Sequence, residues 1–91
     1  MSAEVTRTVL ITNKRGLHAR ASAKFVTLAS TQPVEVNVSK DDGAVTGTSI
    51  MGLMMLGAAK GDQITISAEG DSAEDVVATM CALVEGKFGE D

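Results

Sequence analysis

The sequence contains few of the residues that nucleic-acid-binding proteins use. Tryptophan and tyrosine are absent, and aromatic residues make up only 2% of the 91 residues. The formal net charge is −4. Binding to nucleic acid depends on basic surfaces and on aromatic side chains that stack against bases. We therefore expect no nucleic-acid partner.

Cysteine and long apolar runs are equally scarce. The single cysteine, Cys81, has no partner for an internal disulfide, and together with the one histidine it predicts neither a metal site nor a Cys–His nucleophile. It is expected to be a small, buried or half-buried hydrophobic residue. The longest apolar run, 50–59, is interrupted by glycines and is shorter than the roughly 20 residues that span a bilayer. Because no signal-peptide pattern opens the chain, we expect a cytoplasmic protein without membrane insertion.

The chain length and composition predict one domain over residues 1–91. Hydrophobic residues make up 44% of the chain, enough for one core at this length. Alternating apolar and polar residues predict strands, and apolar residues three or four positions apart predict helices. The expected strands are 5–12, 34–39, 44–47 and 63–68, and the expected helices are 18 or 19 to 29, 50–56 and 73–84. Residues 86–91 have no periodicity and predict a frayed acidic tail.

This order, β-α-β-β-α-β-α, predicts the fold class. Asp42-Gly43 is typical of a tight hairpin turn between the second and third strands. Ser72 followed by Asp75 predicts a capping box at the start of the last helix. Four short strands with one apolar face need cover from the helices on that face. We expect an α+β, open-faced β-sandwich, with a four-stranded antiparallel sheet covered on one face by three helices.

His18 is the first candidate for chemistry. It is the only histidine and lies where a turn leads into the first helix, two residues before Arg20. A helix N-terminus has free N–H groups and a partial positive charge, so it binds phosphate and favours a neutral, nucleophilic imidazole. The guanidinium of Arg20 is suited to phosphate oxygens. A lone histidine near an arginine is also an ordinary surface pairing, and the spacing alone leaves both interpretations open.

The short helix 50–56 carries two further candidates. Ser49 precedes it, where a phosphate would be held by the helix end, although a plain N-cap serine is the simpler interpretation. Ile50, Met51, Met54 and Met55 are too densely placed for one buried stripe on two helical turns. Partial exposure of these flexible side chains would suit a surface that accepts several partners, whereas any single methionine could instead fill a gap in the core.

Two motifs carry a resemblance to a known family. Gly16-Leu17-His18-Ala19-Arg20 resembles the active-site signature of the HPr family, the phosphocarriers of the bacterial phosphoenolpyruvate-dependent phosphotransferase system. Thr48-Ser49-Ile50-Met51-Gly52 is similar to the regulatory-serine segment of that family, and 64–70 is similar to its last strand. The resemblance extends over roughly residues 5 to 85.

The resemblance implies a phosphoryl carrier of sugar transport rather than an enzyme. In this interpretation Enzyme I phosphorylates His18 on a ring nitrogen with the help of Arg20, and the group passes to Enzyme II A-type proteins. Ser49 would be the target of an ATP-dependent HPr kinase/phosphorylase. The protein would be a monomer without cofactor or metal, and its partner-binding face would comprise Ala19, Ala23, Ile50, Met51 and Met54.

One departure from the family pattern and several alternatives accompany this interpretation. Ala21 stands where many family members have a proline that preorganises the first helical turn, so a looser site is expected. A nitrogen-related branch of the family, which regulates other proteins, is an alternative function. A protein-binding module that does not use His18 is a second alternative. A small hydrolase using Arg20 is a third, but the motif offers it no second acid–base group.

Overall fold

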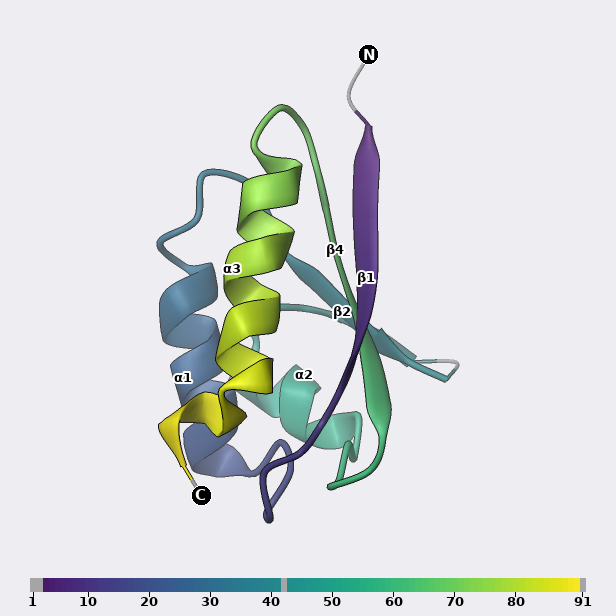
Figure 1. Ribbon diagram of the computed structural model, residues 1–91, viewed down its shortest axis with the longest axis vertical. Coiled ribbons are helices and arrows are strands. Elements are labelled where there is room, and N and C mark those ends of the chain that lie inside the picture. Colours follow the sequence, from purple (N-terminus) through teal and green to yellow (C-terminus); the bar gives the residue numbers. More distant parts are fainter. Residues whose placement is uncertain (1–2, 42, 91) are drawn as a thin grey trace.

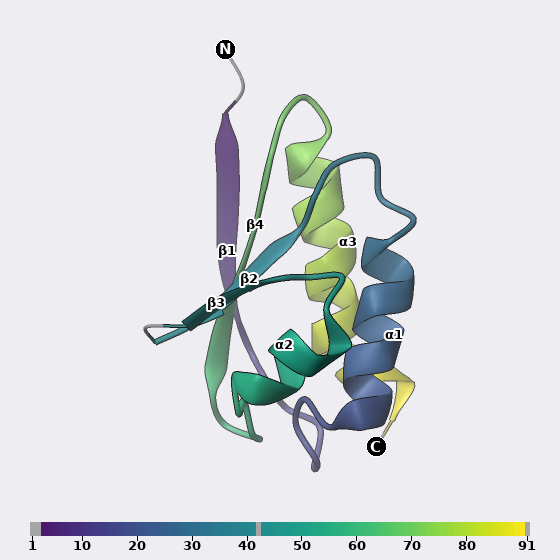
Figure 2. The same cartoon turned by 180° about the vertical axis from the view of Figure 1, so that it is seen from behind.

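The computed structural model describes residues 3–41 and 43–90. The elements are β1 (Glu4–Leu10), α1 (Ala19–Ala29), β2 (Asn37–Lys40), β3 (Gly43–Thr46), α2 (Ile50–Met55), β4 (Gln63–Glu69), α3 (Ala73–Glu85) and a final 3₁₀ turn, η1 (Lys87–Gly89) (Figure 1). The strands form one antiparallel sheet in the order β1-β4-β2-β3. Figures 1 and 2 show α1 and α3 side by side along one face of this sheet. The expected open-faced sandwich is confirmed.

The strand register separates the two faces of the sheet. Strand β4 pairs with β1 and β2, so that Val9 lies opposite Ile64, and Val38 opposite Ile66. All four side chains are at most 3% exposed. Because neighbouring residues of a strand point to opposite faces, these side chains face the helices, and the residues between them face away. The helices close the core with Phe25 of α1, Leu53 of α2 and Met80 of α3, each 0% exposed.

The start of β2 and the cap of α3 differ from those predicted, and other element ends shift by one or two residues. Strand β2 begins at Asn37 rather than at residue 34, although the carbonyl of Val36, just before it, still accepts from the N–H of Gly47, at 2.7 Å. The capping box at Ser72 is wrong: its backbone, at φ −93° and ψ 4°, is not extended, and its side chain makes no cap hydrogen bond. The β2–β3 hairpin is confirmed by the pairing of Lys40 with Gly43. Asp42, in its turn, lies outside the described residues.

The C-terminal segment, residues 86–90, is ordered against the helices, whereas the sequence predicts fraying. Phe88 is only 1% exposed, and its carbonyl oxygen accepts a 2.7 Å hydrogen bond from Nζ of Lys24 on α1. The backbone of Lys87 and Phe88 is left-handed, with φ 58° and 55°. This conformation is unfavourable for residues with a side chain, and burial of the phenyl ring offsets its cost. Asp91, the last residue of the expected tail, lies outside the described residues.

Candidate functional site

A close contact between two loops positions the turn before α1. The N–H of Gly16 donates to Asn13 O at 3.2 Å, and the N–H of Leu17 donates to Ala58 O at 2.9 Å. Gly16 has φ +63°, and a Cβ at this position would lie 2.4 Å from Ala58 O. Only glycine fits such a left-handed residue in contact with another backbone. The turn is thus fixed to the loop that follows α2, and this sets where α1 begins.

His18 is the N-cap residue of α1 and lies at the turn into the first helix, where the sequence places it. Its backbone is extended, at φ −73° and ψ −179°, and its Nδ1 accepts from the N–H of Arg20 at 3.3 Å. Its Nε2 lies 2.8 Å from Oε2 of Glu90. Because Nδ1 faces a donor and Nε2 faces a carboxylate, the pattern assigns the ring proton to Nε2 and leaves the lone pair on Nδ1. The side chain is 22% exposed, so the ring is partly accessible.

Glu90 is a member of the site that the sequence reasoning missed. Its two carboxylate oxygens accept from Asn13 Nδ2, at 3.1 Å, and from His18, and its side chain is 20% exposed. Desolvation raises the pKa of this carboxyl. The hydrogen bonds from Asn13 and His18 and the electrostatic attraction of His18 and Lys24 outweigh it and hold the pKa of Glu90 below its ordinary value. The only sequence signal was Phe88, an apolar residue in an otherwise polar ending.

Asn13 is the second residue that was missed, and it is completely buried. Its Nδ2 donates both to Gly16 O, at 2.8 Å, and to Glu90. Its Oδ1 is buried with no hydrogen-bond partner. The two acceptors, Gly16 O and the Glu90 carboxylate, both lie on the side of the amide nitrogen, and they fix the orientation of the amide.

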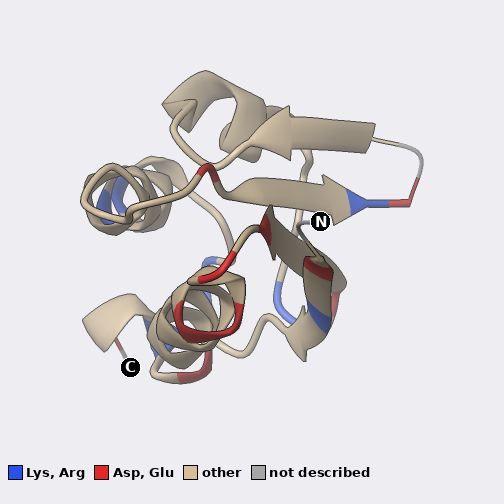
Figure 3. Ribbon diagram, turned by 90° about the horizontal axis from the view of Figure 1, so that it is seen from above, with Lys and Arg blue, Asp and Glu red and all other residues tan. Residues whose placement is uncertain are grey.

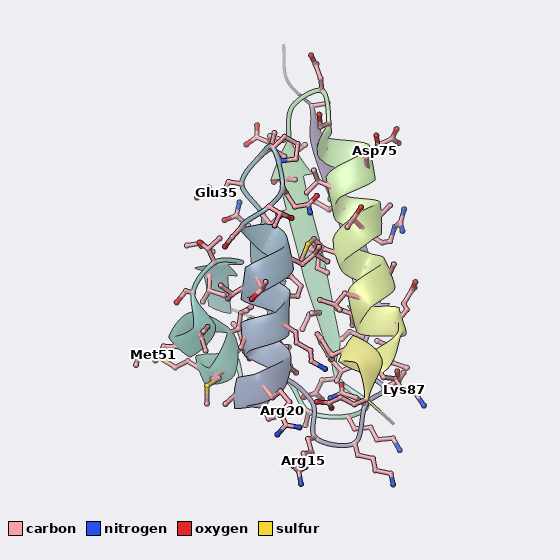
Figure 4. All side chains as sticks on the ribbon, turned by 90° about the vertical axis from the view of Figure 1, so that its left-hand side faces the viewer. Arg15, Arg20, Glu35, Met51, Asp75 and Lys87 are labelled. Carbon is pink, nitrogen blue, oxygen red and sulfur yellow. The ribbon has the colours of Figure 1, made fainter. Side chains whose placement is uncertain are left out.

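Positive side chains surround this arrangement. A cleft of about 480 Å³ is lined by His18, Gly89 and Glu90 together with Lys14, Arg15, Arg20 and Lys24. Figure 4 shows Arg15, Arg20 and Lys87 at the same end of the molecule, and Asp75 and Glu35 at the opposite end. The first turn of α3, which carries two acidic residues, lies at that opposite end, which faces the viewer in Figure 3. The His18 end is therefore electrostatically suited to an anion.

Ser49 caps α2, as the sequence predicts. Its Oγ accepts from the N–H of Gly52 at 2.9 Å. The expected exposure of the neighbouring apolar residues is also observed: Met51 and Met55 are 72% and 79% exposed, and Ile50 and Met54 are 43% and 44% exposed. We call these four residues the α2 patch. Figure 4 shows Met51 on α2, beside the helix α1 that carries Arg20.

The remaining predicted positions lie on α1 and α3. Ala19 is exposed, Ala23 is half-buried, and Ala21 is 0% exposed. The first turn of α1 is regular, since the N–H of Ser22 donates to His18 O at 2.9 Å. The loosening expected from Ala21 stays a prediction. Cys81 is buried, as expected, and burial raises the pKa of its thiol despite the nearby guanidinium of Arg7.

The described residues contain no group of three or more His, Cys, Asp or Glu side chains placed to hold a metal ion. Within residues 3–41 and 43–90, no helix has the length and apolar character needed to cross a membrane.

Comparison with known proteins agrees with this fold. Residues 5–86 match the family PTS-HPr, described as the PTS HPr component phosphorylation site. The chain is 48% identical over 84 residues to the phosphocarrier protein HPr of Neisseria meningitidis serogroup B, covering 92% of this chain and 94% of the relative. It is 40% identical over 88 residues to the phosphocarrier protein NPr of Escherichia coli K12, covering 96% and 98%. The crystal structure of HPr-C-His from Thermoanaerobacter tengcongensis superposes with a TM-score of 0.89 at 44% identity, covering 96% and 98%.

The fold and these relatives together define a small phosphoryl carrier. The chain belongs to the HPr family of phosphocarrier proteins of the phosphotransferase system. A phosphocarrier is a substrate of its partners, so the expectation that the protein is not an enzyme is confirmed by its family. Relatives named HPr and NPr both match over nearly the whole chain, which leaves the branch open.

Proposed function

We propose that His18 accepts a phosphoryl group on Nδ1 from a phosphoenolpyruvate-dependent Enzyme I and donates it to Enzyme II A-type proteins. The observation that carries the proposal is the geometry of the N-cap: Nδ1 points at the N–H of Arg20, while Nε2 is held by Glu90. The unprotonated nitrogen is therefore the one that faces the helix N-terminus, and its lone pair, which accepts from the N–H of Arg20, is the nucleophile. That end of α1 presents N–H groups to the oxygens of an incoming phosphoryl group.

The transfer needs no acid or base on this chain. A bond forms between Nδ1 and phosphorus while the bond between phosphorus and the donor breaks in line with it. The imidazole keeps its proton on Nε2 and becomes a cation. In the onward transfer the Nδ1–P bond breaks, and its electron pair returns to Nδ1. The protein contributes positioning and charge, the two effects that dominate phosphoryl transfer.

Arg20 has two roles in this proposal. Its backbone N–H faces Nδ1, and its guanidinium lines the cleft beside His18. A guanidinium donates two parallel hydrogen bonds to phosphate oxygens. Arg20→Ala is expected to accept the group more slowly or to give a less stable phosphoprotein. His18→Ala is expected to accept none.

We assign partner binding to the α2 patch and to the adjoining face of α1, represented by Ala19 and Ala23. An exposed apolar surface of flexible side chains suits short-lived complexes with several proteins. Met51, Met54 and Ile50 would contact both Enzyme I and the Enzyme II A-type proteins. The protein would act in the cytoplasm as a monomer.

Phosphorylation of Ser49 by an HPr kinase/phosphorylase would regulate these complexes. The Ser49 hydroxyl caps α2 at the edge of the α2 patch, so a phosphate there would place charge against an apolar interface. Ser49→Asp is expected to weaken binding to Enzyme I in calorimetric titrations, with Ser49→Asn as the neutral control that preserves a capping side chain. Equal affinities of the two variants would contradict this role.

The carrier proposal is tested by incubating the protein with a cognate Enzyme I and phosphoenolpyruvate and measuring the intact mass without acid. The expected result is a gain of one phosphoryl group that is lost in acid and absent in His18→Ala, because phosphohistidine is acid-labile. No gain would favour a binding module that uses the α2 patch without His18. A phosphorylated protein whose partners regulate rather than transport would assign it to the nitrogen-related branch.

A further inference from the structure

We propose that Asn13 and Glu90 form a positioning relay that holds the His18 ring and balances the positive charge it acquires during phosphoryl transfer. The inference rests on the proposed function of His18 and adds two residues from opposite ends of the chain. The contacts run from the Asn13 amide to one oxygen of Glu90, at 3.1 Å, and from the other oxygen to His18 Nε2, at 2.8 Å.

The state of Asn13 is the first argument. Its amide nitrogen serves two acceptors while its oxygen is buried without a partner. A 180° turn of the amide would give Oδ1 no better arrangement, since it would then face the carbonyl of Gly16 and the carboxylate of Glu90. The amide nitrogen therefore faces the two acceptors, and the Glu90 carboxylate is one of them.

The anchoring of the C-terminal segment is the second argument. Phe88 is buried, its carbonyl is held by Lys24, and the N–H of Glu90 donates to Lys87 O at 2.9 Å. These contacts fix the backbone before Glu90 independently of its carboxylate. The position of the Glu90 carboxylate beside His18 is thus set by the packed backbone of the C-terminal segment.

The chemistry supplies the third argument. When Nδ1 bonds to phosphorus, the ring still carries its Nε2 proton and gains a positive charge. A carboxylate hydrogen-bonded to that proton stabilises the charge as it develops and fixes the ring orientation, which is how an aspartate assists a catalytic histidine. No proton needs to leave the ring, so the atoms and charges of the transfer remain balanced.

The rate of phosphoryl acceptance from Enzyme I tests the relay. Glu90→Gln removes the charge at constant length, and Glu74→Gln, on the exposed first turn of α3, is the matched control. We expect Glu90→Gln to be about tenfold slower, a modest loss because the pair is partly exposed. Glu90→Asp, which keeps the charge, is expected to recover part of the rate. Equal rates for Glu90→Gln and Glu74→Gln would overturn the proposal.

A double-mutant cycle tests the role of Asn13. Asn13→Ser removes the amide that holds Glu90 and is expected to slow acceptance severalfold. Combined with Glu90→Gln, it is expected to add little, because both changes break the same relay. Full additivity of the two losses would refute the coupling. A thermal melt of each variant identifies any loss caused by unfolding.

Two measurements separate the relay from a structural role and from a failure of the carrier proposal. Amide exchange at Gly89, whose N–H donates to Gly86 O at 3.0 Å, is expected to be unchanged in Glu90→Gln. If Glu90→Gln lost amide protection at Gly89 to the same extent as it lost the rate of phosphoryl acceptance, Glu90 would only hold the C-terminal segment in place. That result would overturn the relay. Without Enzyme I, the Nε2 proton of His18 is expected to give an NMR signal that is lost in Glu90→Ala. Its absence from the wild-type protein would refute the pairing, even if phosphorylation succeeds.

Discussion

Replacing Gly16 by alanine tests whether contact between two backbones fixes the position of His18. Gly16 and Gly57 have nearly the same left-handed backbone, with φ +63° and +66°. Alanine should therefore cost about 1 kcal/mol at either position through its backbone alone. At Gly57 the added Cβ would meet nothing within 4 Å, whereas at Gly16 it would lie 2.4 Å from Ala58 O and 2.7 Å from the Cα of Ala59. Neither backbone atom can move aside by a rotamer change.

The turn before α1 must therefore shift in Gly16→Ala, and the 2.9 Å hydrogen bond from Leu17 to Ala58 would be strained or lost. We expect the free energy of unfolding to fall by about 3 kcal/mol or more in Gly16→Ala and by about 1 kcal/mol in Gly57→Ala. Urea titration followed by circular dichroism measures both values, since the chain has no tryptophan to report by fluorescence. Equal losses in the two variants would refute the argument.

Other predictions concern the core, the C-terminal segment and the thiol. Phe88→Ala is expected to lower the free energy of unfolding by about 3 kcal/mol, measured by the same titration, because the ring is 1% exposed. Leu53→Ala should lower the free energy of unfolding by about 2–5 kcal/mol, and Met55→Ala by about 0.5 kcal/mol or less. Similar losses in the two variants would contradict the assignment of Met55 to a solvent-facing patch. Cys81, whose thiol pKa is raised by burial, should react with a thiol reagent far more slowly in the native protein than in urea. Because the pKa of Glu90 is lowered from 4.5 in the folded protein, the pairing of its carboxylate with His18 is fully present above that ordinary value and is lost as the pH falls through the lowered pKa. The chemical shift of the His18 Nε2 proton should change over that range, and a chemical shift that does not depend on pH there would contradict the pairing.

The elements with strong local patterns could be predicted from the sequence. Alternating apolar and polar residues predicted β4, and apolar residues three or four positions apart predicted α1, because each element has one face in the core and one in solvent. The place of His18 at the start of α1 and the N-cap position of Ser49 followed from turn residues placed directly before apolar helical segments. The exposure of the α2 patch could be predicted from the number of large apolar side chains on α2, since a two-turn helix cannot bury four of them together with Leu53.

The contacts of the site could not be predicted, because they join residues far apart in the chain. Glu90 lies 72 residues from His18 and 77 from Asn13. No local pattern encodes which of twelve acidic residues reaches the histidine. The failed capping box at Ser72 has a related cause, since the motif was present but the backbone conformation was set by the turn after β4. The docking of the C-terminal segment was missed because one apolar residue, Phe88, has no periodicity.

The topology explains why the end of the chain meets the histidine. Helices α1 and α3 run in opposite directions over the sheet, so the last turn of α3 lies at the same end of the molecule as the first residue of α1 (Figure 1). From there, Phe88 enters the core and Glu90 follows two residues later, within hydrogen-bonding distance of the ring. Burial of the phenyl ring thus sets the position of the carboxylate. Because of this link, a change that loosens Phe88 should impair phosphoryl acceptance at His18 even when the histidine, Arg20 and Glu90 are all retained.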